Sequence, residues 1–132
     1  MAAQIILPRL GVSGLVSFLL DTGADQTVLM PADALRLNLD HAQLRGSVQS
    51  VGVGGPSQDF LETGVIVVTD GVLHAYSINV IVSQPRQELM GVPSLIGRNI
   101  MNRWRVVFDY TSKTVTAEIL SSDFQAPIPA AH

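Results

Sequence analysis

The chain has 132 residues, 47% of them hydrophobic and only 14% charged, with a formal net charge of −3. This composition predicts one folded domain and excludes a disordered chain. The acidic balance argues against a nucleic-acid partner, and the absence of cysteine excludes a disulfide framework. No apolar run approaches the ~20 residues needed to cross a bilayer, so we expect no membrane partner. The compartment stays open, with the cytoplasm as the default.

Taken in order, the chain begins with an apolar segment, residues 5–7, that we expect to be a strand. Pro8 follows it, and residues 11–14 contain two glycines, which is typical of a turn. The first two strands are therefore predicted to form a hairpin. The second strand of this hairpin leads directly to Asp21.

Asp21 follows a segment, residues 15–20, in which five of six residues are apolar. Such a segment predicts a strand inside the core. Burying an unpaired carboxylate at the end of a core strand costs free energy, so its presence there suggests a functional role. Thr22 and Gly23 then allow a tight turn, and residues 27–29 return to the apolar pattern. The alternative is that Asp-Thr-Gly is an ordinary surface turn.

Residues 31–37 are predicted to form a short helix with proline in its first turn, and residues 40–45 a polar loop. Residues 47–53 alternate between apolar residues and small or polar ones, as an exposed hairpin arm does, and residues 52–55 are rich in glycine. The glycine spacing matches neither a dinucleotide fingerprint nor a phosphate loop. This segment is either a plain hairpin turn or a mobile flap that closes over a substrate.

The second half of the chain is also predicted to be mostly strands. We expect strands over 63–69, 72–82 and 95–96, a helix over 97–102, and a last hairpin of 105–109 with 114–119. The first two of these strands are joined by a turn at Asp70–Gly71. The whole is an all-β domain with one or two short helices. We assign residues 1–124 to this single domain and residues 125–132 to a Pro/Ala-rich tail.

Other chemistries find no support in the sequence. There is no Gly-x-Ser-x-Gly segment for a serine nucleophile. His41, His74 and His132 are scattered and have no metal-ligand spacing. We therefore expect neither a metal nor a cofactor.

Three segments in order carry a family resemblance. They are Leu-Leu-Asp-Thr-Gly-Ala-Asp at 19–25, Val-Gly-Val-Gly-Gly at 51–55 and Ser-Leu-Ile-Gly-Arg-Asn-Ile-Met at 94–101. Together they resemble the retropepsins, the retroviral-type aspartic proteases. The resemblance implies a closed β-barrel of the acid-protease fold. The extra hairpin within residues 106–120 is more similar to the bacterial and cellular relatives than to the viral enzymes.

The resemblance also implies roles for named residues. Asp21 would be the catalytic acid and base, Thr22 would hydrogen-bond across a dimer axis, and Gly23 would accept a bond from the substrate backbone. Ala24 and Asp25 would line the adjoining subsites.

Further residues are implied as flap and support. The flap tip that contacts the substrate would consist of Gly52, Val53 and Gly54. Structural support would come from Gly97, Arg98 and Asn99: Gly97 would pack against the catalytic loop and Arg98 would form an ion pair with Asp25. Arginine suits a planar carboxylate partner.

Peptide hydrolysis without a metal, thiol or activated serine needs one group to deprotonate water and another to protonate the amide. Two carboxylates that share a proton can do both. This chain has a single Asp-Thr-Gly, so the second carboxylate must come from Asp21 of another copy. The sequence predicts a homodimeric aspartic endopeptidase that acts on peptides or proteins.

The candidates for an apolar interface between copies come from the added hairpin: Val106, Phe108, Val115 and Ile119. Two other interpretations stay open. The domain could be a catalytically silent peptide-binding module that kept the fold, or a dimerisation module of a larger protein.

Overall fold

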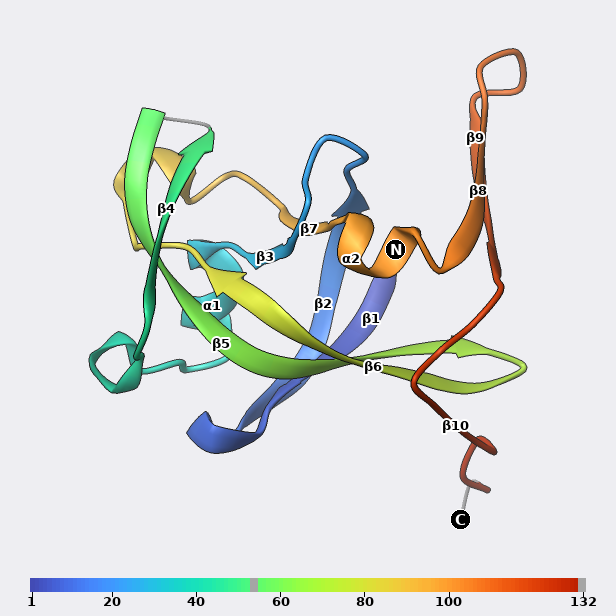
Figure 1. The fold of residues 1–132 in the computed structure, drawn as a ribbon, viewed down its shortest axis with the longest axis horizontal. Helices are drawn as coiled ribbons and strands as arrows, with labels where there is room; N and C mark the ends of the chain where they lie inside the picture. The colour runs from blue at the N-terminus through green and yellow to red at the C-terminus, as the bar shows by residue number, and fades with distance from the viewer. Residues whose placement is uncertain (53–54, 131–132) are drawn as a thin grey trace.

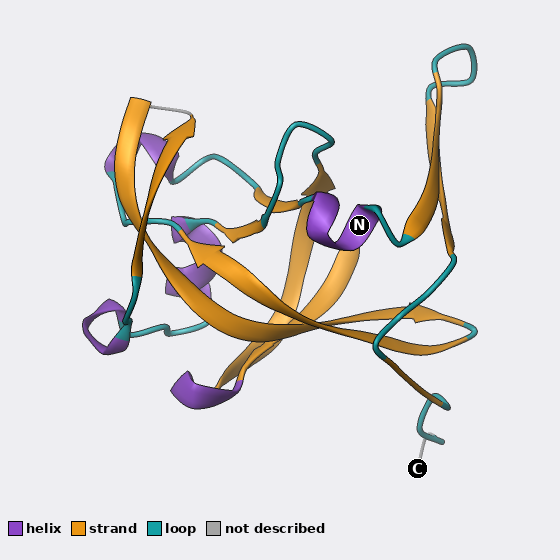
Figure 2. Ribbon diagram, viewed as in Figure 1, coloured by secondary structure: helices purple, strands orange, loops and turns teal. Residues whose placement is uncertain are grey.

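The computed structural model describes residues 1–52 and 55–130, with the backbone alone described for 49–52 and 55–57. Its strands are β1 (Ala2–Leu7), β2 (Val12–Leu20), β3 (Thr27–Leu29), β4 (Ser47–Gly52), β5 (Gly55–Asp70), β6 (Val72–Val82), β7 (Ser94–Ile96), β8 (Trp104–Asp109), β9 (Thr114–Ile119) and β10 (Phe124–Ala126). The α-helices are the short α1 (Pro31–Arg36) and α2 (Arg98–Met101), and 3₁₀ turns are η1 (Pro8–Leu10), η2 (His41–Gln43) and η3 (Gln87–Leu89). Figure 2 shows how little of the fold is helical.

Six strands close into a barrel in the order β6-β3-β7-β2-β1-β5, and pairing of β5 with β6 completes the ring. β4 pairs with β5 outside the ring, and β10 pairs with β6 (Figure 1). The all-β prediction, a closed barrel with short helices, is confirmed. Within the described residues, no helix is long and apolar enough to cross a membrane.

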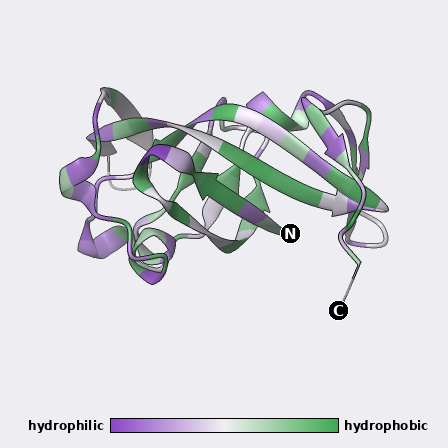
Figure 3. Cartoon of the chain, turned by 90° about the horizontal axis from the view of Figure 1, so that it is seen from below, coloured by the Kyte–Doolittle hydropathy of each residue, from purple (hydrophilic) through white to green (hydrophobic). Residues whose placement is uncertain are grey.

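The core lies inside the barrel and follows the period of two that a strand imposes. Along β1 the side chains of Ala3, Ile5 and Leu7 are buried, and their neighbours face outward or lie at the boundary. The other strands contribute buried side chains in the same way: Val16, Phe18, Leu29, Ile66, Tyr76, Val80, Val82 and Ile96. Figure 3 shows hydrophobic stretches along the strands.

The first turn differs from its prediction. The structure places it at Pro8–Leu10, a 3₁₀ turn that ends at Gly11 with φ +65°, and β2 begins at Val12. The expected turn at residues 11–14 is therefore wrong. Proline starts the 3₁₀ turn and Gly11 supplies the left-handed residue that ends it, so the reversal is complete before Val12 pairs with Leu7.

β5 is one continuous strand of 16 residues, although the sequence predicted a flap arm and a separate strand over 63–69. It pairs with β4 at one end, with β1 in its second half and with β6 from Phe60 to Asp70. At Gly64 a Cβ would lie 2.8 Å from Leu7 Cδ2 and 3.2 Å from the carbonyl oxygen of Ile6. Gly64 therefore allows close packing against β1 and does not interrupt the strand.

β8 and β9 form a separate two-stranded sheet, here called the C-terminal arm, that stands away from the barrel (Figure 1). Its base is held by Trp104, whose Nε1 donates to the Tyr76 hydroxyl at 2.7 Å. That hydroxyl in turn donates to the carbonyl of Ser121 at 2.8 Å. The chain then adds β10 on β6, with Phe124 opposite Ala75, so the first two residues of the predicted tail lie in a strand.

Candidate active site

Asp21 directly follows β2, where the strand leaves the barrel. Its backbone N–H donates to the carbonyl of Ile96 on β7 at 3.0 Å, and its carboxylate Oδ1 accepts from the N–H of Gly23 at 2.9 Å. The side chain is half-buried, while Thr22 and Gly23 are exposed. The core strand thus ends on a carboxylate that is fixed by its own turn and still open to a ligand.

The segment from Asp21 to Asp25, here called the Asp21 loop, rests on α2. The N–H of Arg98 donates to the carbonyl of Ala24 at 2.8 Å, and the N–H of Asn99 donates to that of Asp25 at 3.1 Å. The guanidinium of Arg98 forms an ion pair with the Asp25 carboxylate; these side chains are 50% and 75% exposed. A pair so exposed contributes at most ~1 kcal/mol to stability, so we assign the positioning of the loop mainly to the backbone bonds.

Gly97, the N-cap of α2, packs closely against the backbone of residues 24–26. A Cβ at Gly97 would lie 2.4 Å from the backbone carbon and oxygen of Gln26 and 2.9 Å from the carbonyl oxygen of Ala24. These atoms are backbone, so a larger residue would have to displace the loop. The absence of a side chain here permits the hydrogen bonds from Arg98 and Asn99.

A partly buried polar network links the Asp21 loop, β3 and α2. Asn99 Oδ1 accepts from both the N–H and the hydroxyl of Thr27, at 3.1 and 2.9 Å, and the Thr27 hydroxyl accepts from the N–H of Gly97 at 3.3 Å. The Asn99 amide nitrogen donates to the carbonyl of Asn79 and to Gln26 Oε1, each at 3.3 Å. Sequence reasoning read Thr27 only as a strand residue, although a hydroxyl at the start of an apolar strand was a signal.

A second buried contact was also missed. Ser94 is fully buried; its hydroxyl donates to Asp33 Oδ2 at 2.6 Å and accepts from the N–H of Met30 at 2.9 Å. It links β7 to the start of α1. Because Ser94 also pairs with Phe18 of β2, this contact supports the strand that carries Asp21.

The structure does not bring all the predicted site residues together. Gly52 ends β4 and pairs with Gly55 through the backbone, and Val53 and Gly54 lie outside the described residues. The Thr22 side chain has no hydrogen-bond partner in the described part of this chain. In Figure 1 the Asp21 loop, between β2 and β3, extends to the same side of the barrel as the β4–β5 hairpin and the C-terminal arm. Within residues 1–52 and 55–130, no group of three His, Asp or Glu side chains could hold a metal ion.

The fold and this site define a retropepsin-like domain. Residues 13–103, over two thirds of the chain, match the model of the family described as "gag-polyprotein putative aspartyl protease", and the chain belongs to this family. The structure is similar to that of a retropepsin-like aspartic protease from Rickettsia conorii, with a TM-score of 0.57 and 20% identity over 88% of this chain and 92% of the other. Comparison with curated proteins finds no match.

Proposed function

We propose that this protein is an aspartic endopeptidase that works as a homodimer with one Asp21 from each chain. The observation that carries the proposal is the half-buried Asp21 carboxylate at the end of a core strand, held by the N–H of Gly23 at 2.9 Å. Its loop rests on α2 through backbone hydrogen bonds and leaves the carboxylate open to a ligand. Membership of a protease family supports the same assignment.

The second chain follows from the chemistry. One carboxylate cannot hold the proton that the leaving amine needs and also accept a proton from water. Two Asp21 carboxylates related by a two-fold axis share one proton and divide these roles. In this arrangement Thr22, whose side chain is exposed, bonds to the partner's loop, and Gly23 receives the substrate backbone.

The C-terminal arm supplies a surface for the second copy. Side chains paired across the two strands lie on the same face, so one face is wholly apolar: Trp104, Val106, Phe108, Val115, Ala117 and Ile119. At the base, Trp104 is buried and Val106 and Ile119 pack on the barrel core. Farther out, Phe108 and Val115 are each 52% exposed. The apolar face thus continues from the core into solvent, and we propose that a second copy covers it.

The reaction then proceeds between the two chains. Water lies between the two Asp21 carboxylates; the ionised one takes its proton as the oxygen attacks the peptide carbonyl carbon. The other carboxyl gives its proton to the amide nitrogen as the C–N bond breaks. The backbone near Gly52 lies in the hairpin that we propose closes over the substrate and excludes water.

Asp21→Asn tests the proposal. This change keeps the size of the side chain and removes the acid and base, so cleavage of a peptide library, read by mass spectrometry at acidic pH, should be lost. The matched control is Asp70→Asn in the β5–β6 turn, where Thr69-Asp70-Gly71 contains the same three residues in another order. Cleavage by the Asp21→Asn protein equal to that of the control would overturn the proposal.

A further inference from the structure

A hollow of about 430 Å³ lies at the base of the β4–β5 hairpin, away from Asp21. Its walls come from three segments: Pro8 and Arg9 of η1, Arg45 and Gly46 before β4, and residues 61–63 of β5. The nine residues of β2 separate η1 from Asp21, which is roughly 30 Å of strand at ~3.3 Å per residue. The hollow is therefore separate from the catalytic site.

The charges in this hollow do not balance. Glu62 is only 5% exposed, and Arg9 bonds both of its carboxylate oxygens, with Nε at 3.2 and 3.1 Å and Nη2 at 2.5 Å. Arg9 Nη2 also donates to the carbonyl of Gln43 at 2.9 Å. One guanidinium thus satisfies the buried carboxylate. Arg45 adds a second positive charge, so the group of three carries a net charge of +1.

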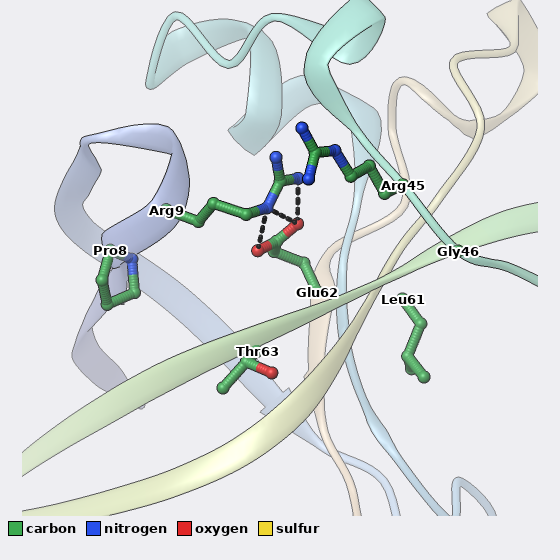
Figure 4. A pocket seen from close by; sticks show the side chains of 7 residues that line it. All are labelled: Pro8, Arg9, Arg45, Gly46, Leu61, Glu62 and Thr63. Carbon is green, nitrogen blue, oxygen red and sulfur yellow. Dashed lines mark hydrogen bonds and ion pairs between the residues drawn. The ribbon is translucent and has the colours of Figure 1, made fainter.

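Two sets of N–H donors are left over. Among the described residues, neither Arg9 Nη1 nor the guanidinium of Arg45 has a hydrogen-bond or ion-pair partner. Figure 4 shows the two guanidinium groups next to each other above Glu62 in the same hollow. Contact with Glu62 raises the pKa of Arg9 above its usual value, so this cation stays charged throughout the range of pH in which the fold works.

We propose that this hollow binds the carboxylate of an acidic side chain in a polypeptide substrate, as a docking site outside the cleavage cleft. The proposal rests on the protease function proposed above. A planar carboxylate fits the planar donor fork of Arg45, with Arg9 Nη1 as a further donor. Pro8 also lines the hollow and offers an apolar wall to the methylene stem of such a side chain, which a free phosphate does not have.

The docking site lies next to the β4–β5 hairpin, which we propose closes over the substrate. Gly46 follows Arg45 and lies immediately before β4. It has a φ of +64°, and its carbonyl accepts a hydrogen bond from the N–H of Leu61 at 3.2 Å. Arg9 belongs to the barrel, whereas Arg45 belongs to the segment that enters the hairpin. A bound carboxylate would connect the two. The site therefore selects substrates with an acidic residue distant from the scissile bond.

Binding can be measured apart from catalysis with Asp21→Asn protein and a fluorescein-labelled, C-terminally amidated peptide, Gly-Ser-Glu-Glu-Glu-Ser-Gly. We expect fluorescence anisotropy to show saturable binding in low salt, and Arg45→Gln to weaken it about threefold to fivefold, as for exposed ion pairs. The matched control is Lys113→Asn, which also removes one exposed charge and keeps a residue type suited to the φ of +55° there. The Gln analogue of the peptide should bind no better to wild type than to Arg45→Gln protein.

Equal affinity of the Arg45→Gln and Lys113→Asn proteins for the acidic peptide would overturn the docking site, whatever the enzyme cleaves. Full competition by millimolar inorganic phosphate with the same dependence on Arg45 would overturn the carboxylate assignment. Peptide binding that depends on Arg45, in a protein whose wild-type form cleaves nothing, would support the docking site and contradict the proposed protease function. The two proposals thus fail in distinguishable ways.

Discussion

Asn99 holds Thr27 at two atoms: a single side-chain oxygen accepts from the Thr27 N–H at 3.1 Å and from its hydroxyl at 2.9 Å. The two residues lie 72 positions apart in the chain, at the first turn of α2 and the start of β3. Thr27 is fully buried, and its hydroxyl also accepts from the N–H of Gly97. This contact fixes the end of the Asp21 loop to the helix that supports it.

Removal of the Thr27 hydroxyl should destabilise the protein. Thr27→Val keeps the shape but leaves the N–H of Gly97 without its acceptor and Asn99 Oδ1 with one donor fewer, so we expect a loss of about 1–3 kcal/mol in the free energy of unfolding. Urea denaturation measures it. Thr27→Ser keeps the hydroxyl and is the control. A Thr27→Val protein as stable as the Ser variant would contradict this account of the network.

Gly97→Ala should displace the Asp21 loop. Its Cβ would lie 2.4 Å from the backbone of Gln26, so the chain must shift, at about 1–3 kcal/mol in the free energy of unfolding. Gly91→Ala is the control, because a Cβ there meets nothing within 4 Å. Thermal unfolding should separate the two variants, and peptide cleavage should fall only in Gly97→Ala. Equal stability of both would mean that the loop and α2 are not in close contact.

The elements were predictable from the sequence where the pattern is local. The apolar run at residues 5–7, the Asp70–Gly71 turn and the apolar strand before Asp21 all depend on neighbouring residues. The Asp21 loop and α2 were placed together only by a family resemblance, because their contact joins residues more than 70 positions apart. The hydroxyl of Thr27 at the start of an apolar strand is a local signal of its role. Nothing local marks Ser94 or the pairing of β10 with β6, since these depend on which segments the closed barrel brings together.

Two errors have a physical cause. Residues 55–70 contain Pro56 and Gly64, which usually interrupt strands, yet β5 continues through both. Gly64 lies there because Leu7 crosses too closely for a side chain. The first turn was placed too late because its two glycines, Gly11 and Gly14, suggested a centre between them, whereas the 3₁₀ turn at Pro8 had already reversed the chain.

The attachment of the C-terminal segment should weaken in acid. Arg103, and then the N–H of Ser77, hold the pKa of Asp123 below its usual value. A depressed carboxyl pKa contributes stability above the unfolded-state value of ~3.9 and loses it as pH falls through the folded-state value. We therefore expect unfolding free energy to drop below about pH 4, less steeply in Asp123→Asn protein. Asp70→Asn is the control, and an identical drop in Asp123→Asn and wild type would contradict the prediction.

The two faces of the C-terminal arm can be compared with one pair of residues. Val115 lies on the apolar face and is 52% exposed, whereas Val107 lies on the opposite face and is 49% exposed. Thr has nearly the shape of Val but brings a hydroxyl into an apolar contact, twice in a symmetric dimer. Val115→Thr should weaken dimerisation roughly tenfold or more in sedimentation equilibrium, and Val107→Thr should not. Equal effects of the two changes would place the interface elsewhere.

The central claim is that two chains form one site, and subunit mixing tests it most directly. Wild-type protein at fixed concentration is mixed with increasing Asp21→Asn protein, with Asp70→Asn protein as the control titrant, and the rate of peptide cleavage is measured. The account predicts that excess Asp21→Asn chains suppress cleavage, because mixed dimers carry one competent carboxyl group, and that Asp70→Asn chains do not. Cleavage per wild-type chain that is unchanged by a large excess of Asp21→Asn protein would show that one chain suffices and would contradict the shared site.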